Sequence, residues 1–228
     1  MEKKTFNLSI EVLKRFERAG VLKHFIIIGS WSIYFYKHYF NAKSYSTFIR
    51  TMDIDFLIPI PSKFPDNVRI FDLLEDLGFI EEYKGSEGYM KISHPDLTVE
   101  FLVPERGRGH DEPYLIPQLS INAIPLRYLD FLVENTISIS AEGLRIKLPH
   151  PAAYALHKFI IFKRRRNADK HDRDIEGALR VFQALMDHGD AAEVRRIFGK
   201  MHKKWQKTII DNLRTIKEED VISILEAR

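Results

Sequence analysis

The sequence predicts an α/β (α+β) domain with a mixed sheet, followed by an α-helical C-terminal domain. The first observation is that short apolar runs alternate with amphipathic helical patterns and then give way to three strand candidates in succession. The second is that the pattern is helical from Pro149 and Pro151 to the end of the sequence. We therefore expect two domains, residues 1–148 and 149–228. A chain of 228 residues with 45% hydrophobic content is long enough for one large domain or two small ones.

The N-terminal elements are predicted from apolar spacing and from serine and proline positions. Residues Leu8 to Ala19 have the apolar spacing of an amphipathic helix. The segment HFIIIG, residues 24–29, reads as a short buried strand, and Ser30 opens the helical segment SWSIYFYKHYF. A polar, serine-rich connection over residues 42–47 leads to a strand from Met52 to Ile60, which prolines end.

The next elements are predicted from a change in hydrophobic period. The segment NVRIFDLLEDLG, residues 67–78, is helical, with Gly78 as its C-cap. Three strand candidates separated by turn residues then favour an antiparallel meander: FIEEY (79–83), YMKIS (89–93) and LTVEFLV (97–103). An edge hairpin and four helices complete the prediction: residues 136–140 with 144–149, then Ala152–Phe162, Asp172–Asp187, Ala191–Leu213 and Glu218–Glu226.

Composition and charge exclude some classes of protein and favour others. The chain has no cysteine, which excludes disulfides and thiolate metal sites and fits a reducing compartment. No apolar run is long enough to span a membrane, and no apolar segment follows the N-terminal lysines, so we expect a cytoplasmic protein without a secretion signal. The formal net charge is +3, but basic residues concentrate late in the chain, in KRRR (163–166) and KMHKK (200–204). An anionic partner is allowed by this pattern, not required.

Two aspartates stand at the start of an apolar strand in the stretch RTMDIDFLIPIP, residues 50–61. Asp53 and Asp55 point to the same face because strand side chains alternate, with their Cα atoms roughly 7 Å apart. Two such carboxylates repel each other unless they share a proton or hold cations. Magnesium takes oxygen ligands, and two ions can activate an attacking hydroxyl and neutralise a leaving phosphate. Glu100, in a later strand, is placed to be the third carboxylate of this cluster.

A phosphate-binding feature precedes these acids in the chain. Gly29 ends a buried strand and lets a ligand approach the backbone, and Ser30 supplies a hydroxyl beside the amides that open the next helix. Gly-Ser by itself is a weak signal, and Ser30 can also be an ordinary helix cap. In series with Asp53, Asp55 and Glu100 the signal is much stronger.

These residues resemble a known family. The GS, DID and VEFLV motifs look like the signature of the nucleotidyltransferase fold shared with DNA polymerase beta, and RTMDIDF with the downstream HKF resembles the bacterial branch that includes abortive-infection type nucleotidyltransferase toxins. The resemblance covers residues 25–103 well and the helical tail loosely. It implies transfer of a nucleotidyl group from a nucleoside triphosphate to an acceptor, with two Mg²⁺ ions, for which Mn²⁺ can substitute.

The resemblance also implies roles for individual residues. Gly29 and Ser30 would bind the triphosphate, Asp53 and Asp55 would ligate both metals, and Glu100 would ligate one metal and help deprotonate the acceptor hydroxyl. By the same resemblance, Lys158 would contact the triphosphate from the first C-terminal helix. The sequence departs from the family in one respect, because the interval from the GS to the DID motif is longer than the family usually shows. An insertion around Lys37 to Thr47 would explain this interval and act as a lid or a homodimer contact, and the alternative is a degenerate site.

Ordinary structural alternatives stand beside these roles. Arg50 is as well suited to anchoring the aspartates as to binding substrate, and Lys158 as well suited to lying on a helix surface as to binding phosphate. The late basic residues are usually a solvated face, with RNA backbone or triphosphate as the functional alternative. The main hypothesis is a metal-dependent nucleotidyltransferase whose acceptor, RNA such as tRNA among the options, is unknown. A non-catalytic nucleotide- or RNA-binding module is the alternative.

Overall fold

The computed structural model describes residues 3–41, 45, 52–64, 68–84, 88–107, 112–164 and 168–227. The chain divides into two compact units. The first unit contains Met1–Tyr39 and Ser46–Pro149, and the second contains Phe40–Tyr45 and His150–Arg228. A short segment before the strand with the aspartates therefore groups with the C-terminal helices, and each unit is described by itself below.

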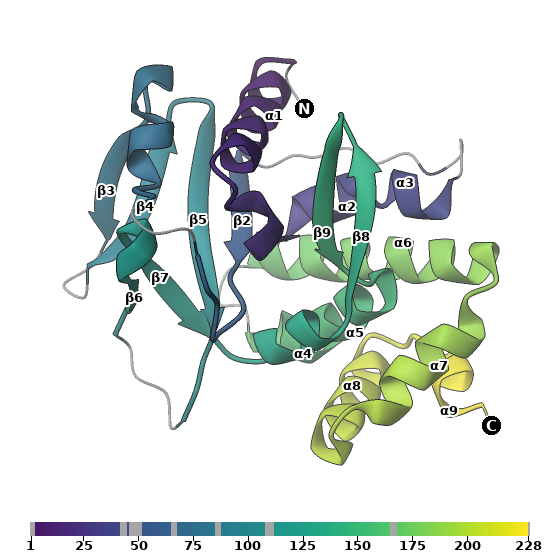
Figure 1. The fold of residues 1–228 in the computed structure, drawn as a ribbon. Coiled ribbons are helices and arrows are strands. Elements are labelled where there is room, and N and C mark those ends of the chain that lie inside the picture. Colours follow the sequence, from purple (N-terminus) through teal and green to yellow (C-terminus); the bar gives the residue numbers. More distant parts are fainter. Residues whose placement is uncertain are drawn as a thin grey trace. The chain divides into compact units, whose positions relative to one another are not determined.

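The first unit is built on a mixed sheet with the strand order β1-β2-β5-β4-β3 (Figure 1). The strands of this order have these bounds: β1 Ile26–Ile28, β2 Asp53–Leu57, β3 Ile80–Lys84, β4 Tyr89–His94 and β5 Leu97–Pro104. Two further strands, described below, extend the sheet from β5. Strand β2 is antiparallel to β1 and parallel to β5, and β3, β4 and β5 form the predicted antiparallel meander. The predicted mixed sheet is confirmed, and β5 lies at its centre.

One face of the sheet is covered by helix α1, Lys3–Arg18, which lies against the sheet beside β2 and β5 (Figure 1). Its Phe16 ring lies 5.2 Å from the ring of Phe56 on β2 and 6.4 Å from the ring of Phe101 on β5, measured between centroids. All three side chains are fully buried. Burial of each such aromatic ring contributes on the order of 2 kcal/mol. The apolar side chains of alternate positions in β2 and β5 therefore fix which face of the sheet is the core.

The segment between β2 and β3 differs from the predicted helix over residues 67–78. It forms two short 3₁₀ turns, η2 (Phe71–Leu73) and η3 (Glu75–Leu77). The α-helix prediction is wrong here because the backbone forms bonds outside the segment: the amide of Val68 donates to the carbonyl of Gln118 at 3.2 Å. Gly78 does adopt the predicted left-handed conformation that ends the last turn, with φ 87°.

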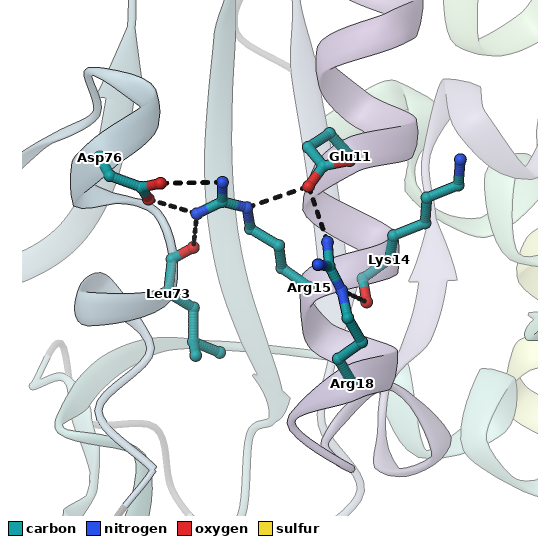
Figure 2. A network of polar contacts seen from close by, with 6 residues as sticks. All are labelled: Glu11, Lys14, Arg15, Arg18, Leu73 and Asp76. Atoms are coloured by element: carbon teal, nitrogen blue, oxygen red, sulfur yellow. Dashed lines mark hydrogen bonds and ion pairs between the residues drawn. The ribbon is translucent and has the colours of Figure 1, made fainter.

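A side chain from α1 holds these turns in place (Figure 2). Arg15 donates to the Leu73 carbonyl at 2.9 Å and to both carboxylate oxygens of Asp76, and its Nε donates to Glu11 at 3.1 Å. Arg18 donates to the same Glu11 carboxylate at 2.7 Å. The Arg15 guanidinium holds the pKa of Asp76 below its usual value by hydrogen bonding. A carbonyl that would bond within an α-helix is thus satisfied by a charged donor from another element.

The rest of the first unit contains two strands and a helix that sequence reasoning left unassigned. They are β6 (Tyr114–Ile116), β7 (Ile121–Leu126), which is parallel to β5 and antiparallel to β6, and α4 (Leu129–Glu134). The predicted hairpin is confirmed as β8 (Thr136–Ala141) and β9 (Leu144–Pro149), but it forms a separate two-stranded sheet. The predicted helix after Ser30 is broken at Tyr36 into α2 (Ser30–Phe35) and α3 (Lys37–Phe40).

The described part of the second unit is helical, as predicted. Its helices are α5 (Pro151–Ile161), α6 (Ala168–His188), α7 (Ala191–Lys200), α8 (Lys203–Thr215) and α9 (Glu219–Glu226). The single helix predicted over residues 191–213 is wrong, because His202 caps a new helix there, its Nδ1 accepting from the Lys204 amide at 3.2 Å. His150 caps α5 in the same way through the Ala152 amide at 3.2 Å, and burial lowers the pKa of His150.

Candidate active site

The two aspartates lie on the sheet face opposite α1. Ile54 and Phe56 of β2 are fully buried on the α1 side, so Asp53 and Asp55 point the other way by strand alternation. Asp53 is exposed and Asp55 is half-buried, while Leu57 at the end of the strand is buried. The open part of this face is therefore the part that carries the acids.

Glu100 lies beside Asp55 on the neighbouring strand. Strands β2 and β5 run parallel, with Asp53 opposite Thr98 and Asp55 opposite Glu100. Residues opposite each other in adjacent strands point to the same face, so the three carboxylates share one face of the sheet. The sequence prediction that the two strands are neighbours is confirmed.

Gly29 brings the start of helix α2 against Asp55. Strand β1 is antiparallel to β2 with Ile28 opposite Asp55, and Gly29 follows with φ 70° and ψ −149°, a conformation that essentially requires glycine. A Cβ atom at Gly29 would lie 2.6 Å from Oδ2 of Asp55, far inside van der Waals contact. Ser30, the first residue of α2, follows directly. The structure therefore brings the GS motif and the second aspartate together.

Lys91 on β4 is a site residue that sequence reasoning missed. It lies directly opposite Glu100 in the antiparallel pairing of β4 and β5, and its ammonium forms an ion pair with the Glu100 carboxylate. Both side chains are largely buried, with 22% and 18% of their surfaces exposed. A signal was present in the sequence: the turn at Pro95 and Asp96 leaves two residues between the strands and fixes the register that aligns Lys91 with Glu100.

The donor set suits a hard divalent cation, but its members are not gathered around one point. Asp53, Asp55 and Glu100 offer oxygen ligands of the kind that Mg²⁺ prefers. Within the described residues, no three His, Asp or Glu side chains form a group that could hold a metal ion. The Glu100 carboxylate is paired with the Lys91 ammonium of β4.

The roles predicted for Arg50 and Lys158 stay predictions. Arg50 lies outside the described residues, as do residues 42–44, 46 and 47 of the proposed insertion around Lys37 to Thr47. Lys158 belongs to the second unit, where its ammonium lies 2.5 Å from the Asp174 carboxylate of α6. The alternative of an exposed lysine on a helix surface is wrong, since the Lys158 side chain is 10% exposed. A contact with triphosphate stays a prediction.

Comparison with known proteins assigns the family. A family model described as nucleotidyltransferase matches residues 7–200, which is most of the chain. The chain belongs to the nucleotidyltransferase family. This nucleotidyltransferase is therefore an enzyme of a class that binds a nucleotide and an acceptor. The match confirms the resemblance at the level of the family, and the abortive-infection branch stays a prediction.

One solved structure supports the fold, and two others are similar to the chain. An antigenic nucleotidyltransferase-like protein from Paracoccidioides brasiliensis is similar over 97% of this chain and 93% of its own, with a TM-score of 0.54 and 14% identity. The antibiotic-resistance factor ANT(2'')-Ia is similar over 96% of this chain and 98% of its own in a solution structure, with a TM-score of 0.48 and 12% identity. Its complex with adenylyl-2''-tobramycin is similar over 81% of this chain and 96% of its own, with a TM-score of 0.41 and 12% identity.

No curated protein sequence matches the chain. None of the helices in the described part of the chain combines the length and the apolar character that crossing a membrane requires.

Proposed function

We propose that this nucleotidyltransferase moves a nucleotidyl group from a nucleoside triphosphate to an acceptor hydroxyl, using two Mg²⁺ ions for which Mn²⁺ can substitute. The observation that carries the proposal is the contact between Gly29 and Asp55, since a Cβ at Gly29 would lie 2.6 Å from Oδ2 of that aspartate. A phosphate bound at the GS motif would then lie beside the carboxylates. Membership of the nucleotidyltransferase family supports the same reaction class.

The proposed roles follow from position and chemistry. Asp53 and Asp55 would hold the cations, and Glu100 would join them after leaving Lys91. Bound Mg²⁺ would supply neutralisation of phosphate charge and polarisation of the acceptor oxygen. The backbone at Gly29 would admit the triphosphate close to α2. Positioning and electrostatic stabilisation would then provide most of the rate enhancement.

The proposed reaction is a single displacement at phosphorus. The acceptor oxygen forms a bond to the α-phosphorus, and the bond from that phosphorus to the oxygen bridging to the β-phosphate breaks. Pyrophosphate leaves with the electron pair of the broken bond. The proton of the acceptor hydroxyl moves to a carboxylate oxygen of Glu100, the acid that lies next to Asp55 in the sheet.

The test is transfer of label from α-labelled nucleoside triphosphates with Mg²⁺ or Mn²⁺, offered cell RNA, protein extract and small metabolites in parallel. Asp53→Asn and Asp55→Asn should each abolish transfer, because each removes a charged ligand. Asp96→Asn, which removes an acid from the turn between β4 and β5, is the matched control and should keep transfer. Transfer unchanged in Asp53→Asn would refute the proposal. Metal-independent nucleotide binding without transfer in the wild type would favour the non-catalytic module.

The finer assignment to the abortive-infection branch forms part of the same proposal. On this assignment, the enzyme would modify RNA such as tRNA, and this modification would stop the growth of the cells that express it. Expression of the wild type should then arrest growth, and Asp55→Ala should relieve the arrest. Normal growth on expression of a soluble wild-type protein that transfers label in vitro would contradict the toxin role while leaving the reaction class intact.

A further inference from the structure

Positive charge is concentrated in one segment of the second unit. Residues 195–217, called here the basic segment, contain eight Lys or Arg residues and a single acidic residue, Asp211. The segment therefore has a formal charge of +7, while the whole chain has +3, so all other residues together carry −4. The eight are Arg195, Arg196, Lys200, Lys203, Lys204, Lys207, Arg214 and Lys217.

The basic segment forms most of a groove between α7, α8 and the end of α9. The groove has a volume of about 590 Å³. Four of the basic side chains lie on its walls: Arg195, Lys203, Lys207 and Arg214. Its apolar lining comes from Phe198, Ile210 and Leu225, which are buried residues of the three helices. Two acidic residues, Asp211 and Glu226, also line the groove, so its four cations outnumber its acids by two.

Most of the basic side chains have no acidic partner within the described residues. Arg196 pairs with Glu193 at 2.5 Å, and Lys207 and Arg214 share Asp211 at 2.8 and 3.8 Å. The other five make no ion pair in the part of the chain that the structure describes: Arg195, Lys200, Lys203, Lys204 and Lys217. Unpaired charges of one sign repel each other, so a surface that keeps them together is suited to an anionic ligand.

The arrangement favours a chain of phosphates over a single anion. Lys203, Lys207 and Arg214 lie at positions i, i+4 and i+11 of α8, which places them along one side of the helix over about 16 Å. A row of this length exceeds the reach of one phosphate group. RNA offers phosphates in series, bases that can contact an apolar floor, and ribose hydroxyls of the kind that a nucleotidyl group is transferred to.

We propose that this groove binds the phosphate backbone of RNA, and that RNA is the acceptor of this enzyme. The second part of the proposal rests on the function proposed above, whereas the binding itself does not. The ligand class is chosen by charge, by spacing and by the presence of hydroxyl acceptors. An acidic peptide has the same sign of charge and is the competing outcome in the test.

The test measures binding of a fluorescently labelled single-stranded RNA of mixed sequence by anisotropy, without nucleotide and with chelator, over a range of salt concentrations. The double variant Arg195→Gln with Lys203→Gln removes two wall charges that make no ion pair with any described residue. Each lost phosphate contact should reduce the slope of log K against log salt by about 0.7, so the double variant should lose about 1.4. Affinity at low salt should fall by about tenfold or more.

Two further variants serve as controls. Lys14→Gln with Lys23→Gln changes the net charge equally at exposed positions of the first unit and should keep the wild-type slope. Arg195→Lys with Lys203→Arg keeps both charges and should restore RNA binding. Equal slopes for the groove variant and the Lys14 and Lys23 variant would overturn the proposal, as would tighter binding of polyglutamate than of RNA.

Failure of this proposal is distinguishable from failure of the proposed function. If Asp53→Asn binds RNA like the wild type but neither protein transfers label, the groove binds RNA and the proposed reaction is wrong. If the groove variant transfers label to RNA with an unchanged KM for RNA, the reaction class stands and the groove proposal is wrong. A raised KM for RNA with a nearly unchanged kcat is the result expected from the groove proposal.

Discussion

Gly29→Ala should separate the role of the GS motif in the site from its role in the fold. The added Cβ would lie 2.6 Å from Oδ2 of Asp55, whereas Cβ contacts below 3.0 Å essentially do not occur and ordinary contacts begin near 3.4 Å, so the carboxylate must move by about 0.4 to 0.8 Å. Misplacement of a reacting group by about 1 Å typically costs about 100-fold in rate. We therefore expect nucleotidyl transfer to fall by about two orders of magnitude.

The same substitution also strains the backbone. Gly29 has φ 70° and ψ −149°, a region that side chains disfavour by about 1 to 3 kcal/mol. We expect the free energy of unfolding to drop by about 2 kcal/mol, which a protein of this size can tolerate. Loss of rate through unfolding must therefore be separated from loss through displacement of Asp55.

Gly143→Ala provides the matched control. Gly143 lies in the turn between β8 and β9 of the same unit with φ 75°, and no atom lies within 4 Å of a Cβ built there. It carries the cost of a positive φ, about 1 to 2 kcal/mol, without moving any carboxylate. Transfer by this variant should stay close to wild type.

The assay compares three quantities for both glycine variants. Label transfer gives the rate, urea unfolding gives the stability, and calorimetric titration with Mn²⁺ reports the carboxylates without turnover. The reasoning is refuted if Gly29→Ala, shown to be folded, transfers label at a rate within threefold of Gly143→Ala. Equal Mn²⁺ affinity in the two variants would likewise show that Asp55 had not been displaced.

Replacing Lys91 with Met should tighten Mn²⁺ binding several-fold, because the change releases the Glu100 carboxylate and removes a positive charge from the proposed site. Weaker Mn²⁺ binding in a calorimetric titration would contradict this prediction. Arg15→Met should lower the free energy of unfolding by about 1 kcal/mol, since the Leu73 carbonyl loses its charged donor, and an unchanged urea midpoint would count against it. Burial lowers the pKa of His150, so near pH 6.5 the unfolded chain binds more protons at this residue than the folded chain does. The contribution of neutral His150 to the free energy of unfolding is therefore complete above that pH. It is lost as the pH falls through the pKa of His150 in the folded state. His150→Asn keeps a capping acceptor and should flatten the pH dependence of the unfolding midpoint in this range; a profile like the wild type would show that His150 does not cause it.

The parts of the fold that follow from local alternation could be predicted from the sequence. The strand with Asp53 and Asp55, the meander that ends at β5 and the hairpin at Gly143 each have a strict period and clear turn residues. Asp53 and Asp55 share one face of the sheet simply because they are two residues apart on a strand. To predict that β2 and β5 are neighbours in the sheet, one further inference was needed: only a few elements separate them in the sequence.

The features that were missed depend on partners distant in sequence. The segment over residues 67–78 has helical apolar spacing, but Arg15 of α1 captures the Leu73 carbonyl and the Val68 amide bonds to residue 118. Strand β7 was unassigned because Pro125 and the mixed polarity around it do not resemble a buried strand, whereas pairing with β5 stabilises it. Tertiary hydrogen bonds thus decide where local propensity is weak.

The ion pair of Glu100 could have been predicted only in part. The two-residue turn between β4 and β5 fixes the opposition of Lys91 and Glu100, which a register count reveals. Whether the Glu100 carboxylate pairs with Lys91 or lies near the aspartates depends on electrostatics, which the spacing of residues in the sequence does not reveal. Sequence reasoning therefore placed Glu100 on the correct face and missed the group that engages its carboxylate.

The inner position of β5 gives Glu100 a charged neighbour on each adjacent strand. A residue on an inner strand has a neighbour on each side, and here these are Asp55 on β2 and Lys91 on β4. Repulsion from Asp55 and attraction to Lys91 act in the same direction, and both favour the ion pair of Glu100 with Lys91. A cation at Asp53 and Asp55 reverses the first of these forces. Binding of the proposed metal and release of Glu100 from Lys91 are therefore coupled, which gives the sign of the Lys91→Met prediction.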